Sequence, residues 1–115
     1  MSNPVIHFEV VGTDAAVLQS FYAKVFDWKI DANNPAQYGS VEPAPGGIGG
    51  GVCPTVDGST RTMFYVGVAD LQTTLDAVEK LGGVTILPPA DVPGGPRIAM
   101  FNDPDGNRVG LMQQA

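Results

Sequence analysis

The chain has 115 residues, of which 43% are hydrophobic, and its formal net charge is −6. This length indicates one domain, spanning residues 1–115, with enough apolar residues for a core. The excess of acidic residues argues against nucleic acid, whose binding needs clustered Lys and Arg. No stretch approaches the roughly 18 continuous apolar residues of a membrane-spanning helix. Cys53 is the only cysteine, which excludes an intrachain disulfide framework and makes a reducing cytoplasm the expected location.

The first half of the chain predicts one strand, one helix and three further short strands. Residues 5–11 alternate as a strand that places His7 and Glu9 on one face. Asp14 is a suitable N-cap for a helix over about 14–27. The short strands are expected at residues 27–30, 37–41 and 48–53.

The second half predicts the same order of elements. A strand over 62–68 precedes a helix that Asp70 opens and Gly82-Gly83 ends. Three extended segments follow, at residues 84–87, 97–101 and 108–112, and the last two are joined by a turn that contains Asp105-Gly106.

The two halves match at an offset of 56 residues. Phe8 falls on Phe64, Asp14 on Asp70, and Ile30 on Ile86, while the order of elements agrees throughout. Chance similarity between two amphipathic strand–helix units is the alternative, but the agreement in element order favours a duplication. The sequence therefore predicts two βαβββ modules, over about residues 5–56 and 61–115.

Several motifs together resemble one protein family. They are the His in the first strand, the Asp-capped helix that runs into Phe21-Tyr22, and the closing segment from Phe101 to Arg108, with its Asp-Pro-Asp-Gly-Asn turn. The chain resembles the glyoxalase/bleomycin resistance protein/extradiol dioxygenase superfamily, also called vicinal oxygen chelate proteins. This resemblance implies an α+β fold in which two βαβββ modules form a curved mixed sheet around a cleft, and it implies a homodimer.

The resemblance also implies four positions for the ligands of a divalent metal. They fall on His7, on Gly49 (by alignment of Ile48 with Val109), on Met63, and on Gly110. Glycine has no side-chain donor, and a thioether is a poor ligand for hard divalent ions. Only His7 matches the pattern, so no metal site is predicted. A metal held by His7, Glu9 and a third group stays open as an alternative.

The catalytic candidates are His7, Glu9 and Tyr65. His7 titrates near neutral pH and is suited to general base chemistry without a metal. Glu9 lies two residues further along the same strand face, and Tyr65 is its partner in the repeat. For His7 a structural role is the alternative, and for Glu9 an exposed strand position.

Six further residues are expected to line the ligand surface. Methionine adapts to irregular ligands, glycine leaves room, and an arginine can meet an anionic group, although ordinary core packing is the alternative for the methionines. The candidates are Met63, Met100, Arg108, Gly49, Gly110 and Met112.

These observations favour a protein that binds a small molecule in its cleft without the usual metal. The alternative is a lyase, isomerase or dioxygenase of the same superfamily that uses His7 with Glu9 or Tyr65.

Overall fold

The computed structural model describes residues 2–114, which form two compact units. One unit is His7–Met63, called module one below. The other, module two, joins the residues before His7 to those from Phe64 onward. The two boundaries between the modules fall within strands. Inside module two, the backbone N–H of Gly67 donates to the carbonyl of Pro4 at 2.8 Å.

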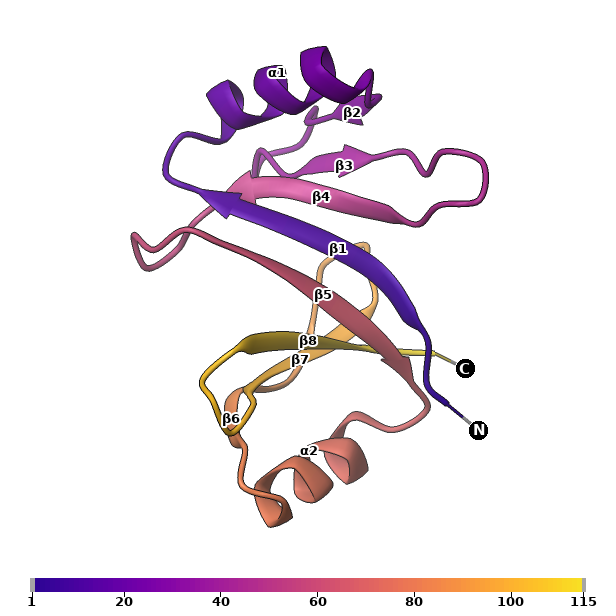
Figure 1. Ribbon diagram of the computed structural model, residues 1–115, viewed down its shortest axis with the longest axis vertical. Coiled ribbons are helices and arrows are strands. Elements are labelled where there is room, and N and C mark those ends of the chain that lie inside the picture. The colour runs from indigo at the N-terminus through magenta and orange to yellow at the C-terminus, as the bar shows by residue number, and fades with distance from the viewer. Residues whose placement is uncertain (1, 115) are drawn as a thin grey trace. The chain divides into compact units, whose positions relative to one another are not determined.

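Module one has the predicted order of one strand, one helix and three strands (Figure 1). Its sheet runs β2-β3-β4-β1, in which β1 and β4 are parallel and the other pairs antiparallel. The elements are β1 (Val5–Gly12), α1 (Ala15–Phe26), β2 (Ile30–Asp31), β3 (Gly39–Val41) and β4 (Gly49–Pro54).

Module two repeats this arrangement. Its sheet runs β5-β8-β7-β6, again with one parallel pair, β5 with β8. The elements are β5 (Arg61–Val68), α2 (Leu71–Lys80), β6 (Val84–Asp91), β7 (Arg97–Asn102) and β8 (Arg108–Gln113). The predicted α+β class and the βαβββ repeat are confirmed.

Both helices begin at the predicted caps. The Asp14 carboxylate accepts from the backbone N–H of Val17 at 3.1 Å, and the Asp70 carboxylate accepts from that of Thr73 at 2.8 Å. These bonds satisfy donors that the first helical turn leaves open. Gly82 follows α2 with a φ of +99°, which glycine adopts without steric cost.

The extended segment at 84–87 is longer than predicted. Strand β6 continues through Pro88 and Pro89 to Asp91. Proline cannot donate to a sheet, but β6 is the terminal strand of the module-two order, and its register with β7 shifts between Leu87 and Ala90. An edge strand with irregular pairing accommodates the prolines.

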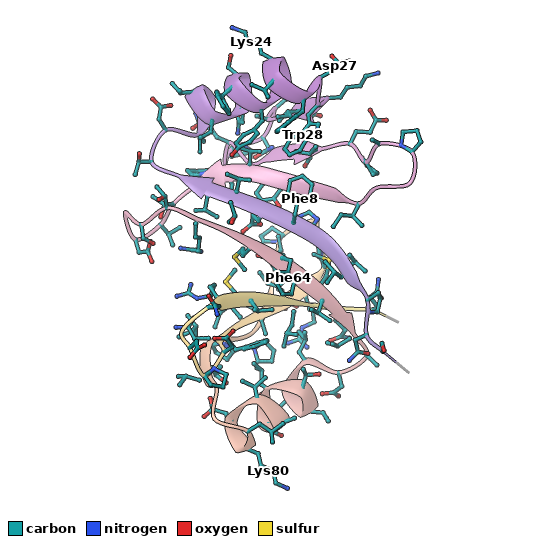
Figure 2. The ribbon with its side chains drawn as sticks, in the orientation of Figure 1. Phe8, Lys24, Asp27, Trp28, Phe64 and Lys80 are labelled. Carbon is teal, nitrogen blue, oxygen red and sulfur yellow. The ribbon has the colours of Figure 1, made fainter. Side chains whose placement is uncertain are left out.

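The helix side of each module holds apolar packing. In module two the buried residues Val68, Leu71, Leu75, Ala99 and Leu111 form one cluster. In module one Phe8 packs against Trp28 beneath α1, with ring centroids 5.1 Å apart (Figure 2). No helix among residues 2–114 has the length and apolar character needed to cross a membrane.

Candidate functional site

A polar network occupies the face of module one that lies opposite α1. His7 and Glu9 alternate with Phe8 along β1, so both point away from the side where Phe8 meets Trp28. In the parallel pairing with β4, His7 lies beside Gly49 and Glu9 beside Gly51. Glu9 is only 8% exposed, and it is the only buried charged residue among those described.

Tyr38 joins the two β1 side chains. Its hydroxyl oxygen lies 2.7 Å from His7 Nε2, and the hydroxyl donates to Glu9 Oε2 at 3.0 Å. A phenol has one proton, and in this network the Tyr38 hydroxyl donates it to Glu9. The Tyr38 oxygen must therefore accept in its bond with His7, and the donor is the N–H at Nε2 of His7. This tautomer leaves the basic lone pair of the imidazole on Nδ1.

The loop before β3 holds Tyr38 in place. The Asn34 carboxamide accepts from the backbone N–H of Tyr38 at 2.9 Å and donates to its carbonyl at 2.8 Å. Gln37 has a φ of +54°, a left-handed conformation that is uncommon outside glycine. The Gln19 side chain donates to the carbonyls of Gln37 at 3.0 Å and Val52 at 2.8 Å, tying this loop to α1 and β4. The tyrosine is therefore fixed from both sides of its backbone.

Gly51 provides the space that the Tyr38 side chain occupies. A Cβ at Gly51 would overlap the phenol oxygen and ring of Tyr38. The neighbouring Gly50 accommodates the Phe8 ring in the same way, with ring atoms 2.5 Å from where a Cβ would stand. The glycine-rich strand thus receives aromatic side chains of its own module at Gly50 and Gly51.

Burial controls the protonation of the groups on this face. Desolvation lowers the pKa of His7 below its usual 6.5, which favours the neutral imidazole. Desolvation, assisted by the charge of Glu9 and opposed by Arg61, raises the pKa of the Cys53 thiol to about 12. Cys53 is therefore a thiol rather than a thiolate at neutral pH, and it is not a nucleophile.

The predicted residues of module two also share a sheet face. In the β7–β8 pairing Met100 lies beside Gly110, which pairs in turn with Tyr65 of β5. Alternation places Met112 and Arg108 on the same face, opposite the Ala99 and Leu111 that belong to the α2 cluster. The Tyr65 ring covers Gly110, since a Cβ there would overlap it, and Tyr65 is 3% exposed.

Two other predicted residues have defined surroundings. The Arg108 guanidinium donates from Nε to the Asn102 side chain at 2.9 Å across the β7–β8 hairpin. Met63 is 6% exposed and belongs to module one. Met63 is therefore as buried as a core side chain.

Strand register corrects one alignment within the repeat. The sequence aligned Gly49 with Gly110, but Glu9 pairs with Gly51 and its repeat partner Tyr65 pairs with Gly110. Gly51 is therefore the equivalent of Gly110. Each of these glycines lies under a tyrosine ring, Tyr38 in module one and Tyr65 in module two.

The metal-ligand positions of the family do not fit a divalent ion in this chain. Of the four positions, the first is His7, the third is Met63 and the fourth is Gly110. The second is a glycine whether it is taken at Gly49 or at Gly51. Glycine supplies no side-chain donor, and zinc, iron or manganese sites need about three protein ligands. Within residues 2–114 no three His, Cys, Asp or Glu side chains come close enough to hold a metal together.

Sequence reasoning missed Tyr38. It assigned Tyr38 to a short strand that begins at Gln37, whereas β3 begins at Gly39 and Tyr38 ends the preceding loop. No sequence signal identified it, because the space for its ring comes from Gly51 beside the buried Glu9, a pairing that only the structure shows.

Comparisons with known proteins agree with this architecture. The family model described as the Glyoxalase/Bleomycin resistance protein/Dioxygenase superfamily matches residues 5–111. The chain belongs to this superfamily. It is 28% identical over 118 residues to a protein of Mycobacterium tuberculosis named "Putative glyoxylase CFP32", a match that covers 88% of this chain and 42% of the relative. The chain thus spans less than half the length of this mycobacterial relative.

A fungal relative has a more similar length. The "Glyoxylase-like domain-containing protein" of Didymella fabae is 32% identical over 108 residues, covering 86% of this chain and 84% of the relative. A solved superfamily member from Vibrio splendidus has a TM-score of 0.69 at 18% identity and covers 98% of this chain and 100% of its own. The crystal structure of methylmalonyl-CoA epimerase from Mycobacterium tuberculosis has a TM-score of 0.65 at 14% sequence identity. The match covers 96% of this chain and 87% of the epimerase chain. These two structures support the superfamily fold.

Proposed function

We propose that the protein binds a small molecule on the sheet face of module one, without the divalent metal of its superfamily. The observation that carries this proposal is the His7–Tyr38–Glu9 network, in which the Tyr38 hydroxyl bonds both other side chains. The network provides polar groups in fixed positions, whereas this chain carries glycine and methionine at the other metal-ligand positions of the family. Fixed polar groups of this kind orient a ligand.

Met63 of module one is proposed to be part of the apolar lining next to the network, while Tyr65, Met100 and Met112 share a sheet face within module two. Methionine side chains adapt to irregular shapes, which suits a ligand that is sequestered rather than coordinated. Gly49, which lies beside His7 in the β1–β4 pairing, is proposed to contact the ligand as well. The net charge of −6 favours an uncharged or cationic compound.

The experiment is a thermal-shift screen of small aromatic and cationic compounds with and without EDTA, followed by calorimetric titration of the hits. We expect hits whose affinity is unchanged by EDTA and falls at least about tenfold in His7→Gln and in Tyr38→Phe. Lys80→Gln is the control, because Lys80 projects from the end of α2 away from the sheet of its module (Figure 2). Binding that requires added Mn²⁺, Ni²⁺ or Zn²⁺, or that both network variants retain, contradicts the proposal.

A second candidate is an enzyme that moves a proton, as a lyase or isomerase does. The observation that favours it is His7, whose lowered pKa keeps the imidazole neutral and able to accept a proton and whose Nε2 bonds Tyr38. In this reading His7 takes a proton from carbon, while Tyr38 and Glu9 hold its tautomer.

Deuterium exchange separates the two candidates. A ligand that only binds keeps its carbon-bound hydrogens in D2O, whereas a substrate exchanges the acidic one, which NMR follows directly. We expect His7→Ala to abolish exchange while far-ultraviolet circular dichroism stays unchanged. Exchange that continues in His7→Ala contradicts the role of His7.

The assembly and the location are part of the proposal. We propose a homodimer, as the superfamily resemblance implies, and a cytoplasmic protein, because its only thiol is buried and unpaired.

A further inference from the structure

Helix α1 carries a polar side chain that turns toward the sheet of its module. Gln19 is half-buried, and its Nε2 donates to the carbonyl of Gln37 at 3.0 Å and to that of Val52 at 2.8 Å. A carboxamide nitrogen has two N–H groups, so each bond uses one of them. The amide of Gln19 therefore joins the helix to a loop and to a strand at a single point.

The repeat indicates that the fold does not require a polar side chain at this position. At the offset of 56 residues Gln19 corresponds to Leu75 of α2, which is 1% exposed and belongs to the apolar cluster of module two. A leucine here stabilises the contact of helix and sheet by burying apolar surface. Gln19 forgoes that gain, and a departure of this kind from the core pattern is expected where a residue serves a site.

The two carbonyls that accept from Gln19 lie next to the two parts of the Tyr38 contact. Gln37 directly precedes Tyr38 in the chain, and Val52 directly follows Gly51, the glycine that makes room for the phenol. One amide group thus joins the peptide that carries the tyrosine to the strand that receives it. The Gln19 bonds therefore set how far the Tyr38 backbone stands from the space at Gly51.

The surroundings of the Gln19 amide are shaped to admit it. A Cβ at Gly39 would stand 2.8 Å from Nε2 of Gln19 and 2.9 Å from the carbonyl oxygen of Val52, the partner of Gly39 in the β3–β4 pairing. A larger residue at Gly39 would displace the amide. The bond to the Gln37 carbonyl also supports the left-handed conformation of that residue, which is unfavourable outside glycine unless its surroundings hold it.

The network that depends on this placement tolerates little displacement. The Tyr38 hydroxyl oxygen lies 2.7 Å from His7 Nε2 and 3.0 Å from Glu9 Oε2. A side-chain contact beyond about 3.5 Å is no longer a hydrogen bond, so a movement of the phenol by about 1 Å breaks at least one of the two. Asn34 clamps the Tyr38 backbone from within the same loop, whereas Gln19 relates that loop to α1 and β4.

We propose that Gln19 is a positioning residue for the ligand site of module one, a role that rests on the proposed function of that site. Gln19 belongs to α1, on the face of the sheet opposite His7 and Glu9, and acts through the backbone on both sides of the Tyr38 contact. Losing its two donors loosens the bonds of the Tyr38 hydroxyl without removing any member of the network.

The experiment removes the donors of Gln19 and follows His7, the only histidine of the chain, by NMR. Gln19→Leu gives α1 the residue that α2 carries, so the apolar packing of the helix is kept. We expect the Nε2–H proton of His7 to exchange with water at least about fivefold faster than in the wild type, because its bond to Tyr38 opens more often. Gln72→Leu is the matched control and should leave the rate unchanged, since Gln72 is exposed on α2, where its side chain bonds Asp76.

Backbone exchange separates positioning from a merely structural role. A general loss of stability in Gln19→Leu would accelerate the exchange of the β1 amides in the same proportion as that of the His7 proton. We expect those amides to change by less than about twofold, and Tyr38→Phe to show the state in which the phenol bond is lost completely. A His7 proton that keeps its wild-type rate, or that changes only in step with the β1 amides, overturns the proposal.

A second variant keeps the test decisive if Gln19→Leu does not fold. Gln19→Glu keeps the shape of the side chain and removes both donors, because a carboxylate only accepts hydrogen bonds. It should also accelerate exchange of the His7 proton, and a wild-type rate in this variant contradicts the proposal.

The compounds from the thermal-shift screen distinguish failure of this proposal from failure of the proposed function. Hits that lose affinity in Tyr38→Phe but keep it in Gln19→Leu contradict the positioning role of Gln19 and leave the ligand site in place. A faster His7 proton in Gln19→Leu together with an empty screen supports the placement of Tyr38 by Gln19 and contradicts the proposed function.

Discussion

The hydroxyl oxygen of Tyr38 lies 2.7 Å from Nε2 of His7, although the two residues are separated by 31 positions in the chain. The same hydroxyl donates to the buried Glu9, so one phenol satisfies two strand residues. Buried polar networks of this kind stabilise strongly when complete and weaken sharply when one member is lost. The behaviour of this network can therefore be tested by stability as well as by function.

Removing only the phenol oxygen tests the network. Tyr38→Phe is expected to lower the free energy of unfolding by about 1–3 kcal/mol, because it deletes hydrogen bonds to a buried carboxylate and to an imidazole. Urea denaturation measures the change. Tyr22→Phe is the matched control, since its ring packs on Trp28 with centroids 5.4 Å apart and it should change stability by less than about 0.5 kcal/mol. Equal effects in the two variants would show that the hydroxyl of Tyr38 contributes nothing specific.

Filling the space at Gly51 tests how Tyr38 is placed. Gly51→Ala puts a methyl group where the phenol lies, so the tyrosine must move away from Glu9. We expect a loss of about 1–3 kcal/mol in the free energy of unfolding, as in overpacked cores. Gly47→Ala is the control, because its nearest contact is the Ala44 carbonyl at 3.4 Å. If Gly51→Ala is as stable as Gly47→Ala, the ring does not need that space.

The fold was predictable because its signals are local. Each helix start depends on a single cap, Asp14 or Asp70, and each strand depends on alternation over a few residues, as in β1 and β5. The 56-residue offset then repeats the same pattern in the second half. Strand β6 was underestimated because proline is normally excluded from strands, and only its edge position makes it acceptable.

The site was predictable only in part. The alternation of β1 placed His7 and Glu9 on one face, since that follows from strand geometry alone. Tyr38 could not be placed, because its position depends on Asn34 clamping its backbone and on Gln37 in a left-handed conformation. Those contacts join a loop to a strand far away in the sequence, and no local pattern encodes them.

Protonation of His7 gives a prediction about pH. Burial places its folded pKa below the unfolded value of 6.5, so the unfolded chain binds more protons wherever the two states differ. Stability from the neutral imidazole is therefore complete above pH 6.5 and is lost as the pH falls toward the folded pKa. NMR of the only histidine should give a midpoint below 6.5, and His7→Asn should remove this part of the pH dependence of unfolding. A midpoint at or above 6.5 would contradict the desolvated site.

The reactivity of Cys53 tests the burial of the same sheet face. Its pKa of about 12 and its buried position leave almost no thiolate at pH 8. Because the thiolate is the reactive species, we expect negligible reaction with a chromogenic disulfide reagent in the native protein and complete reaction in guanidinium chloride. The Asp76→Cys variant is the control, since its added thiol is exposed on α2 and should react at once, leaving Cys53 as the slow group. Rapid reaction of native Cys53 would mean that this face of β4 opens to solvent, and the lowered pKa of His7 would then have to be reconsidered, because it depends on the same burial.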